Sequence, residues 1–329
     1  MNILTNTLKS KTKYEYLISQ THSNIHIGYG IDNNYARCCA SSIASFCFNN
    51  PTKNFNFHIM TNDLSTTNKK QFEQLAQLYS VNIYIYEINI DTLAKLPTQT
   101  HLPIATYFRF ILPLILNNVD KLFYIDADII CLQNADDLFN INLKDNIIGA
   151  VPDLPWMNKK RNKALNLRNH IYFNAGMLII NIAKWNNFNT FTKVLQAIQN
   201  EPQKFRYLDQ DALNLILTNH IQYLDTKFNC IDINNIDKKN IILLHFAAHP
   251  KPWNICWSLS PNCNEFNKNL YQYYEKQTPW SGLPPTLPRN YKEMEFYAKC
   301  LRKHKYYIKS FHWYLKYLLA KIKYLIKKY

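Results

Sequence analysis

Two carboxylates stand directly after an apolar stretch in the middle of this 329-residue chain. The stretch KLFYIDADIICL, residues 121–132, is predicted to be a strand that runs into Asp126, Ala127 and Asp128. Ligands of open α/β sheets bind beyond the carboxyl ends of the strands. Two carboxylates there can share one hard divalent cation, which can bridge a diphosphate. The alternative is a strand-end turn with solvated acids, because the DxD pattern is short and common.

A second polar cluster follows the apolar run IILLHF at residues 241–246 and reads HFAAHPKPW from His245 onward. A histidine at a strand end can complete a metal site. Lys251, six residues later, can neutralise a phosphate. Taken alone, the cluster is equally consistent with a core histidine and a loop lysine.

Three shorter patterns place polar groups near predicted helix and strand ends. YLDQD begins a predicted helix, so Asp209 acts either as its N-cap or, together with Gln210, beside a reacting sugar. Arg109 lies among apolar residues in YFRF. If buried, it needs an anionic partner, either in a ligand or in a structural ion pair. The small residues of NAG at 174–176 permit either the close approach of a ligand or a bulge.

The elements that must position these residues alternate along the chain between strand and helix patterns. Strands are predicted at 25–31, 55–61, 81–88, 121–132, 147–151, 172–182 and 241–246. Helices are predicted after a turn at 32–34 through about 48, and at 65–79, 104–118, 184–199 and 209–218. This rhythm favours a parallel sheet covered by helices. The Pro-rich stretch 278–290 is predicted to be a linker.

Composition argues against several classes of protein. Glycine is scarce, with 5 residues, and neither the P-loop pattern nor the GxGxxG dinucleotide fingerprint occurs. None of the 8 cysteines forms a CxxC pair, which argues against a zinc ribbon or a redox motif. The N-terminus lacks the apolar core of a signal peptide, and no run of about 18 apolar residues is present. We therefore expect reduced thiols and a cytoplasmic location.

Positive charge is concentrated at the end of the chain. The formal net charge is +15, and ten lysines and arginines but no acidic residue follow Glu295. On a helical wheel, residues 302–328 show one stripe made of Arg302, Lys305, Lys309, His312, Lys316, Lys323 and Lys327. The neighbouring face is apolar and contains Ile308, Phe311, Leu315, Leu318, Ile322, Leu325 and Ile326, with Tyr306, Tyr314, Tyr317 and Tyr324 flanking it.

This tail pattern predicts a helix that lies in the interface of an anionic membrane, with residues 302–329 as the docking region. Aromatic and cationic side chains both suit that environment. The alternative is a terminal helix packed on the rest of the fold. A nucleic-acid-binding module is a further alternative, which the apolar face disfavours.

Taken together, these motifs resemble the family 8 glycosyltransferases, and within them the lipopolysaccharide core glucosyl- and galactosyltransferases. The resemblance covers about residues 24–329, and its parts occur in family order: GYGIDNNY, SSIASFCFNN, FHIMT, YFRF, LFYIDADIIC, FNAGMLIIN, LDQDALN and HFAAHPKPW. The resemblance implies a Rossmann-like, mostly parallel nucleotide-sugar-binding sheet of the GT-A type with a C-terminal basic helical extension. We expect a catalytic domain at 1–275 and a linker with the membrane-associating helical region at 276–329.

The resemblance also implies roles for individual residues. Uridine is expected to be held by Gly30, Asp32, Asn34 and Tyr35. A Mn²⁺ ion, or alternatively Mg²⁺, is expected on Asp126, Asp128 and His245, where it bridges the UDP diphosphate around Ala127. Arg109 and Lys251 are expected to contact the donor, and the transferred sugar is expected beside Asp153, Asn174, Asp209 and Gln210. Ala248 departs from the family pattern, which has glycine there, and an added methyl could loosen the diphosphate contact.

The implied activity is transfer of glucose or galactose, with retention, from UDP-glucose or UDP-galactose to a lipopolysaccharide core acceptor at the cytoplasmic face of the inner membrane. Gln210 is the expected group near the anomeric carbon, with Asp209 as the alternative nucleophile. The main rival is a haloacid dehalogenase-type phosphatase, in which a DxD after a strand supplies a nucleophile and an acid. In that class the motif lies near the N-terminus and is followed by Thr or Val, whereas Ile129 and Ile130 follow it here.

Overall fold

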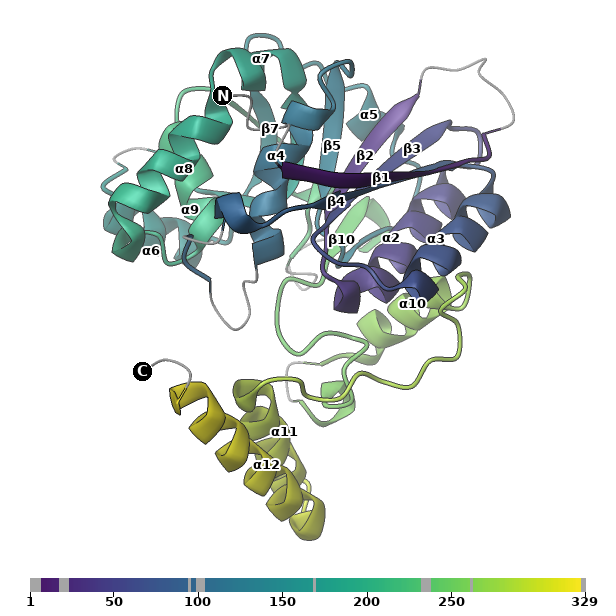
Figure 1. Cartoon of the computed structure of the whole chain (residues 1–329), viewed down its shortest axis with the longest axis vertical. Coiled ribbons are helices and arrows are strands. Elements are labelled where there is room, and N and C mark those ends of the chain that lie inside the picture. The colour runs from purple at the N-terminus through teal and green to yellow at the C-terminus, as the bar shows by residue number, and fades with distance from the viewer. Residues whose placement is uncertain are drawn as a thin grey trace. The chain divides into compact units, whose positions relative to one another are not determined.

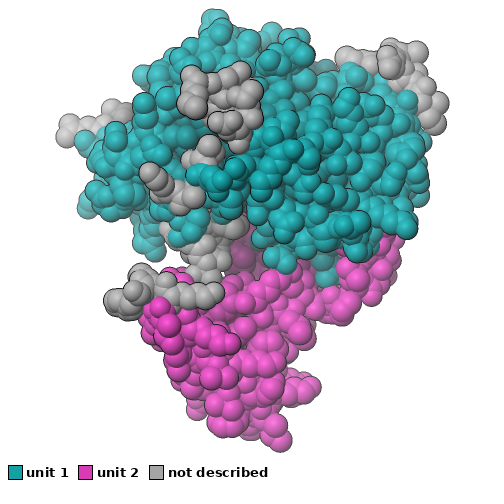
Figure 2. Space-filling view, viewed as in Figure 1, with its two compact units in different colours: residues 1–245 teal, residues 246–329 magenta. Residues whose placement is uncertain are grey.

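The computed structural model describes residues 7–17, 24–93, 96–98, 104–167, 170–231, 238–260 and 263–326. Within it the chain forms two compact units, residues 1–245 and 246–329 (Figure 2). The boundary expected at residues 275/276 separates a catalytic region from a membrane-associating region. This functional division stays a prediction.

The first unit is built on one mixed sheet (Figure 1). Its strands lie in the order β1 (Leu8–Glu15), β4 (Asn82–Ile88), β3 (Phe55–Thr61), β2 (Ile25–Gly30), β5 (Lys121–Ile125), β8 (Phe173–Asn181), β7 (Ile148–Pro152) and β9 (Ile221–Tyr223). The pairs β2–β3, β2–β5, β3–β4 and β7–β9 are parallel, while β1–β4, β5–β8 and β7–β8 are antiparallel. The predicted α/β class with a mostly parallel sheet is therefore confirmed.

The order of the strands reverses at β2, which lies between β3 and β5. Chain order runs outward from β2 to β3 and β4 on one side, and to β5 on the other. Such a switch point leaves a crevice outside the carboxyl ends of the two central strands. Gly30 ends β2, and Asp126 follows directly on β5, so two of the predicted polar segments meet at this crevice.

The stretch predicted as a single strand at 121–132 is divided in the structure. After β5 the chain turns at Asp126–Asp128, with the N–H of Ile129 donating to the carbonyl of Asp126. It then continues as β6 (Ile129–Cys131), which pairs with β10 (Leu243–His245) in a separate two-stranded sheet. This antiparallel pairing sets His245 opposite Ile129, next to the Asp126–Asp128 turn. The turn acids therefore interrupt the strand rather than end it.

The helices of the first unit follow the strands closely. They are α2 (Ala36–Asn49), α3 (Thr66–Tyr79), α4 (Phe108–Ile115), α5 (Asp136–Phe139), α6 (Pro155–Leu165), α7 (Ile182–Asn187), α8 (Thr190–Asn200) and α9 (Leu208–Ile216). The predicted helix at 104–118 is shorter, because residues 104–107 form a 3-10 turn and α4 ends at Ile115, two residues past Pro113. The predicted helix at 184–199 is two helices, α7 and α8, separated by Asn189 with a positive φ of 56°.

The second unit carries the remaining helices, α10 (Glu265–Glu275), α11 (Tyr291–Lys303) and α12 (Tyr307–Ile326). α11 and α12 form an antiparallel pair joined by a short turn in which Lys305 has a φ of 64°. Ser310 donates to the carbonyl of Ala298, and the rings of Tyr297 and Trp313 meet edge to face at 5.2 Å. Among the described residues, no helix is both long and apolar enough to cross a membrane.

Candidate active site

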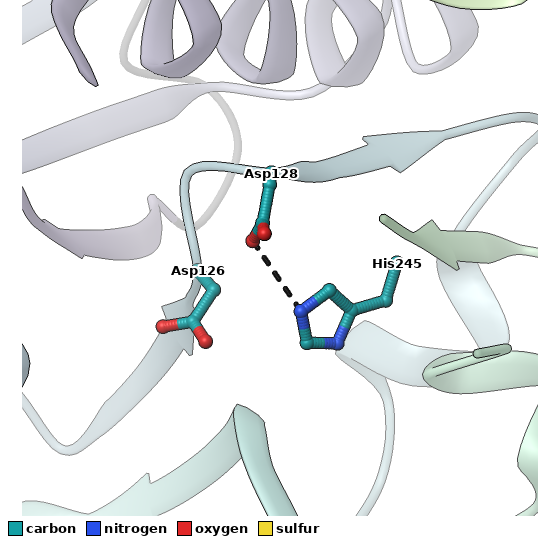
Figure 3. Close-up of side chains that lie close together, drawn as sticks. All are labelled: Asp126, Asp128 and His245. Atoms are coloured by element: carbon teal, nitrogen blue, oxygen red, sulfur yellow. Dashed lines mark ion pairs between the residues drawn. The ribbon is translucent and has the colours of Figure 1, made fainter. Parts of the chain in front are cut away.

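Asp126, Asp128 and His245 converge at the sheet edge (Figure 3). One ligand atom from each lies within 4.8 Å of the other two. His245 Nε2 is 3.3 Å from Asp128 Oδ1, and both side chains are largely buried, with 5% and 10% exposed. Asp126 comes from the end of β5, Asp128 from the turn, and His245 from β10. The pairing of β6 with β10 is what brings these distant residues together.

The candidate ligand atoms of this cluster suit a divalent cation. Asn229 Oδ1 lies 2.9 Å from His245 Nδ1, and an amide oxygen can only accept, so Nδ1 carries the proton. Nε2 lies toward the carboxylate of Asp128, so in the neutral ring its lone pair is placed to share a cation with that carboxylate. Two carboxylates and one imidazole suit Mn²⁺, Mg²⁺ or a similar ion.

Gly176 makes room for the imidazole of His245. A Cβ at this position would lie 2.4 Å from His245 Cε1 and 2.9 Å from Nδ1, closer than real side chains come. The backbone of Gly176 is also engaged, because its carbonyl accepts from the N–H of Asp126 at 2.7 Å. Of the two interpretations of the NAG segment, a bulge is present, since the β7–β8 register shifts between Ala150 and Val151. The group that lies close to Gly176 is the ring of His245.

Arg109 links the candidate metal ligands to the start of α9. Its guanidinium is buried and donates through Nη2 to Asp126 Oδ1 at 2.8 Å, while Nε lies 3.0 Å from Asp209 Oδ2. Nη1 donates to the carbonyl of Ala175. Burial raises the pKa of Asp209 to about 7, and the Arg109 charge opposes that rise. The predicted anionic partners of Arg109 therefore include two carboxylates of the protein.

A continuous hydrogen-bond chain runs from His245 to Gln210. Asn229 donates to Asn174 Oδ1 at 2.9 Å, and Asn174 donates to Asp153 Oδ2 at 3.3 Å. Gln210 donates to the same Asp153 oxygen at 2.9 Å and accepts from the N–H of Ala175 at 3.0 Å. The structure thus brings Asp153, Asn174 and Gln210 together beside the Asp-Asp-His cluster. No sequence pattern marked Asn229.

The four residues expected to hold uridine lie at the other side of the switch point. Asp32 caps the short 3-10 turn Asn33–Tyr35, accepting from the N–H groups of Asn34 at 2.8 Å and Tyr35 at 3.1 Å. Gly30 is packed closely, because a Cβ there would lie 2.9 Å from the Tyr124 hydroxyl. These residues share the crevice edge with β5, and a role in binding uridine stays a prediction.

Ala127 and the two phosphate-contact candidates fall in different places. Ala127 lies inside the turn between the two acids and is 5% exposed. Ala248 and Lys251 belong to the second unit, in the segment that follows β10. There Lys251 is buried and donates through Nζ to the carbonyl of Phe246, while its N–H donates to Asn254 Oδ1 at 2.8 Å.

A buried ion pair that the sequence did not predict fixes α6 against α9. Asp211, which is fully buried, accepts from Arg161 at 2.9 and 2.7 Å. It also accepts from the Tyr172 hydroxyl and the N–H of Tyr207, each at 2.7 Å. Four donors on one carboxylate set the start of α9, where Asp209 and Gln210 lie. The only sequence signal was the second acid of LDQD.

Comparison with known proteins defines the class. Residues 26–256 match the model of glycosyl transferase family 8, and residues 267–321 match its C-terminal model. A lipopolysaccharide 1,3-galactosyltransferase of Salmonella typhimurium is 30% identical over 94% of this chain and 95% of that protein. The lipopolysaccharide glucosyltransferase WaaO of Escherichia coli is also 30% identical, with 97% of each chain covered.

Solved structures agree on the fold. The galactosyltransferase LgtC, crystallised with donor and acceptor sugar analogs, superimposes with a TM-score of 0.68 at 23% identity, covering 80% of this chain and 98% of that one. The α/β sheet carries the candidate divalent-metal cluster at its switch point. The chain belongs to glycosyl transferase family 8 and is a glycosyltransferase.

Proposed function

We propose that this enzyme transfers glucose or galactose, with retention of configuration, from a UDP-sugar to a lipopolysaccharide core acceptor. The observation that carries the proposal is the Asp126–Asp128–His245 cluster at the switch point, linked by hydrogen bonds to Gln210. The two relatives of lipopolysaccharide synthesis, each matched over nearly the full length, support the acceptor class.

Different groups of residues would bind different parts of the donor. Asp126, Asp128 and His245 would hold a Mn²⁺ or Mg²⁺ ion, which when bound neutralises charge that develops on the departing diphosphate. Arg109 fixes the carboxylate of Asp126, so the ligand is in place before the ion arrives. Gly30, Asp32, Asn34 and Tyr35 would hold uridine on the far side of the crevice. Lys251 and the backbone of Ala248 would contact the diphosphate.

The transferred sugar would lie against Asp153, Asn174 and Gln210. Gln210 offers an amide oxygen, which is a poor covalent nucleophile but stabilises positive charge on the sugar ring at the front face. Asp209 is buried and bonded to Arg109, which favours a positioning role over attack on the sugar. We assign retention to a transition state of oxocarbenium character stabilised in this way.

We further propose that α12 docks the enzyme on the cytoplasmic face of the inner membrane. Within its own unit, α12 packs on α11 through Ser310, Trp313, Tyr317 and Tyr324. Tyr317 is therefore buried and does not flank the apolar face as expected. Arg302 and Lys305 precede α12, so they are not part of its cationic stripe. That face remains exposed, with Ile308 88%, Phe311 65% and Ile326 71% accessible. Lys309, Lys316 and Lys323 lie beside it. Lys327 and Lys328 are outside the described residues.

A donor and acceptor panel tests the enzymatic proposal. UDP release is measured with UDP-glucose, UDP-galactose and other UDP-sugars, with truncated lipopolysaccharide cores as acceptors. We expect one of the two hexoses to be transferred and proton NMR of the product to show an α-linkage. A β-linked product would refute retention. Release of inorganic phosphate from phosphomonoesters without sugar transfer would favour the phosphatase alternative.

A further inference from the structure

Helix α6 presents a face to solvent that the proposed donor chemistry does not use. Trp156, Lys159, Lys160 and Lys163 are all exposed, and Trp156 is 58% accessible. Their spacing of i, i+3, i+4 and i+7 places them on one stripe of the helix. The helix reads PWMNKKRNKAL and contains no acidic residue. Among the residues that the structure describes, none of the three lysines has an ion-pair partner.

The opposite face of α6 is held rigidly, so the exposed stripe has a fixed direction. Met157, Arg161 and Leu165 are buried. The bidentate ion pair of Arg161 with Asp211 anchors this inner face to α9. A helix backbone that is positioned by a buried ion pair loses little further conformational entropy when its exposed face binds a ligand.

The stripe begins at the rim of the candidate sugar site. α6 starts two residues after Asp153, whose carboxylate accepts from Asn174 and Gln210. Trp156 is the stripe residue nearest to Asp153 along the chain, and Lys163 lies about 10 Å further along the helix axis. A single sugar ring is too short to touch the whole stripe, whereas an oligosaccharide can do so.

We propose that this face of α6 binds the acceptor oligosaccharide and that it selects an acceptor carrying anionic groups. This inference rests on the proposed function and adds the charge of the acceptor to it. A pyranose ring stacks on Trp156 next to the sugar site. Phosphate groups or sugar-acid carboxylates further along the acceptor pair with Lys159, Lys160 and Lys163.

The test compares acceptors with and without phosphate. Core oligosaccharide released from lipopolysaccharide is used in its native phosphorylated form and after enzymatic dephosphorylation, without any membrane. For Lys159→Gln/Lys160→Gln/Lys163→Gln we expect the acceptor KM to rise about tenfold with kcat nearly constant, since three exposed charge contacts are lost. Trp156→Ala should raise the acceptor KM about as much, and Trp156→Tyr should restore most of the loss because an aromatic face remains.

The two forms of the acceptor identify the source of the negative charge. If phosphate is bound, dephosphorylation raises the wild-type KM and leaves that of the triple variant unchanged. If carboxylates are bound, the triple variant is weakened equally toward both forms. The matched control, Lys9→Gln/Lys13→Gln/Lys70→Gln, removes the same charge from β1 and α3 at the other side of the sheet. It should keep the wild-type acceptor KM.

Several results would overturn the inference. A triple variant with the wild-type acceptor KM would do so, as would one that loses only its binding to anionic vesicles, which would assign the stripe to the membrane. UDP affinity, measured by calorimetry, should be equal in all variants, and its loss would show a donor-site or folding defect instead. If the wild-type enzyme transfers hexose to neither core form, the proposed function itself fails.

Discussion

At the scale of single residues, the geometry of the site depends on residues that hold the candidate ligands in place as well as on the ligands themselves. Gly176 leaves room for His245, because the His245 ring occupies the space that any side chain at position 176 would need. Asn229 contributes in a similar way, since its amide oxygen fixes the His245 tautomer. Both residues act on the candidate metal ligand without being ligands themselves.

We expect Gly176→Ala to weaken metal binding. The added methyl must push the imidazole of His245 out of line with Asp128, and changes around metal ligands typically cost about 10- to 100-fold in metal affinity. Mn²⁺ titration of the purified protein, followed by calorimetry, measures this directly. Asp128→Asn is the reference variant, which should lose both the ion and transfer while keeping its thermal transition. An unchanged Mn²⁺ affinity in Gly176→Ala would contradict this account.

Sequence reasoning reached the candidate ligands but not their supports. Asp126, Asp128 and His245 were predicted because carboxylates and imidazoles at strand ends are chemically conspicuous, and the structure brings them together. Asn229 and Arg161 gave no such signal. Arg161 pairs with Asp211, 50 residues away in the chain, and no local pattern encodes that proximity. Asn229 donates to Asn174, 55 residues away, and lies against His245, 16 residues away.

At the scale of elements, a row of polar side chains crosses three neighbouring strands. His26 on β2 hydrogen bonds to His58 on β3 at 2.9 Å, and His58 bonds to the hydroxyl of Tyr86 on β4 at 3.1 Å. Lys11 of β1 lies over the rings of Tyr84 and Tyr86 on the same side. Burial lowers the pKa of both histidines, and for His58 the neighbouring His26 and Lys11 lower the pKa further.

We predict that this row makes the fold less stable in mild acid. Because the folded-state pKa of each histidine lies below its unfolded value of about 6.5, the unfolded chain takes up protons first. The two histidines cost no stability above about pH 6.5. Below it, the free energy of unfolding falls by up to about 1.4 kcal/mol per pH unit for each histidine, until the pH reaches the lowered pKa of the folded state. Denaturant unfolding between pH 7.5 and 5 measures the slope.

The control for this prediction is His58→Gln, which removes one titrating group but keeps a polar side chain. Its unfolding free energy should depend less on pH than that of the wild type, although it is lower at pH 7.5. Equal slopes for the two proteins would contradict a contribution from His58.

Most elements were predictable, and the exceptions have physical reasons. The strand FNFHIMT at 55–61 alternates apolar and polar residues, yet all of them are buried, because β3 lies inside the sheet between β4 and β2. The buried His58 finds polar partners on both neighbouring strands. β1 was missed since LKSKTKYE is a charged edge strand that buries little and derives its order from pairing with β4. α6 was missed because its polar sequence shows no apolar period.

At the scale of the whole molecule, the two faces of α12 should contribute separately to membrane binding. Lys309→Gln/Lys316→Gln/Lys323→Gln should weaken binding to anionic vesicles about a hundredfold at low salt, at about 1 kcal/mol for each cation. Ile308→Ser/Phe311→Ser/Ile322→Ser should instead remove the binding that persists at high salt, since the exposed apolar side chains are lost. Vesicle co-sedimentation across a salt series separates the two effects.

Neither variant should alter turnover of UDP-sugar in solution, because α12 carries no donor-site residue. Neutral vesicles serve as the control surface, on which the lysine variant should behave like the wild type. If both variants sediment with anionic vesicles as fully as the wild-type protein, α12 is not the docking element.

The pairing of β6 with β10 also bears on how the enzyme matures. Asp128 and His245 are separated by 117 positions in the chain, so the complete ligand set exists only after this long loop has closed. Closure over such a distance is entropically costly and slow compared with local helix formation. An ion held by all three residues would therefore be acquired late, when β10 joins β6, and would then stabilise the contact that created its site.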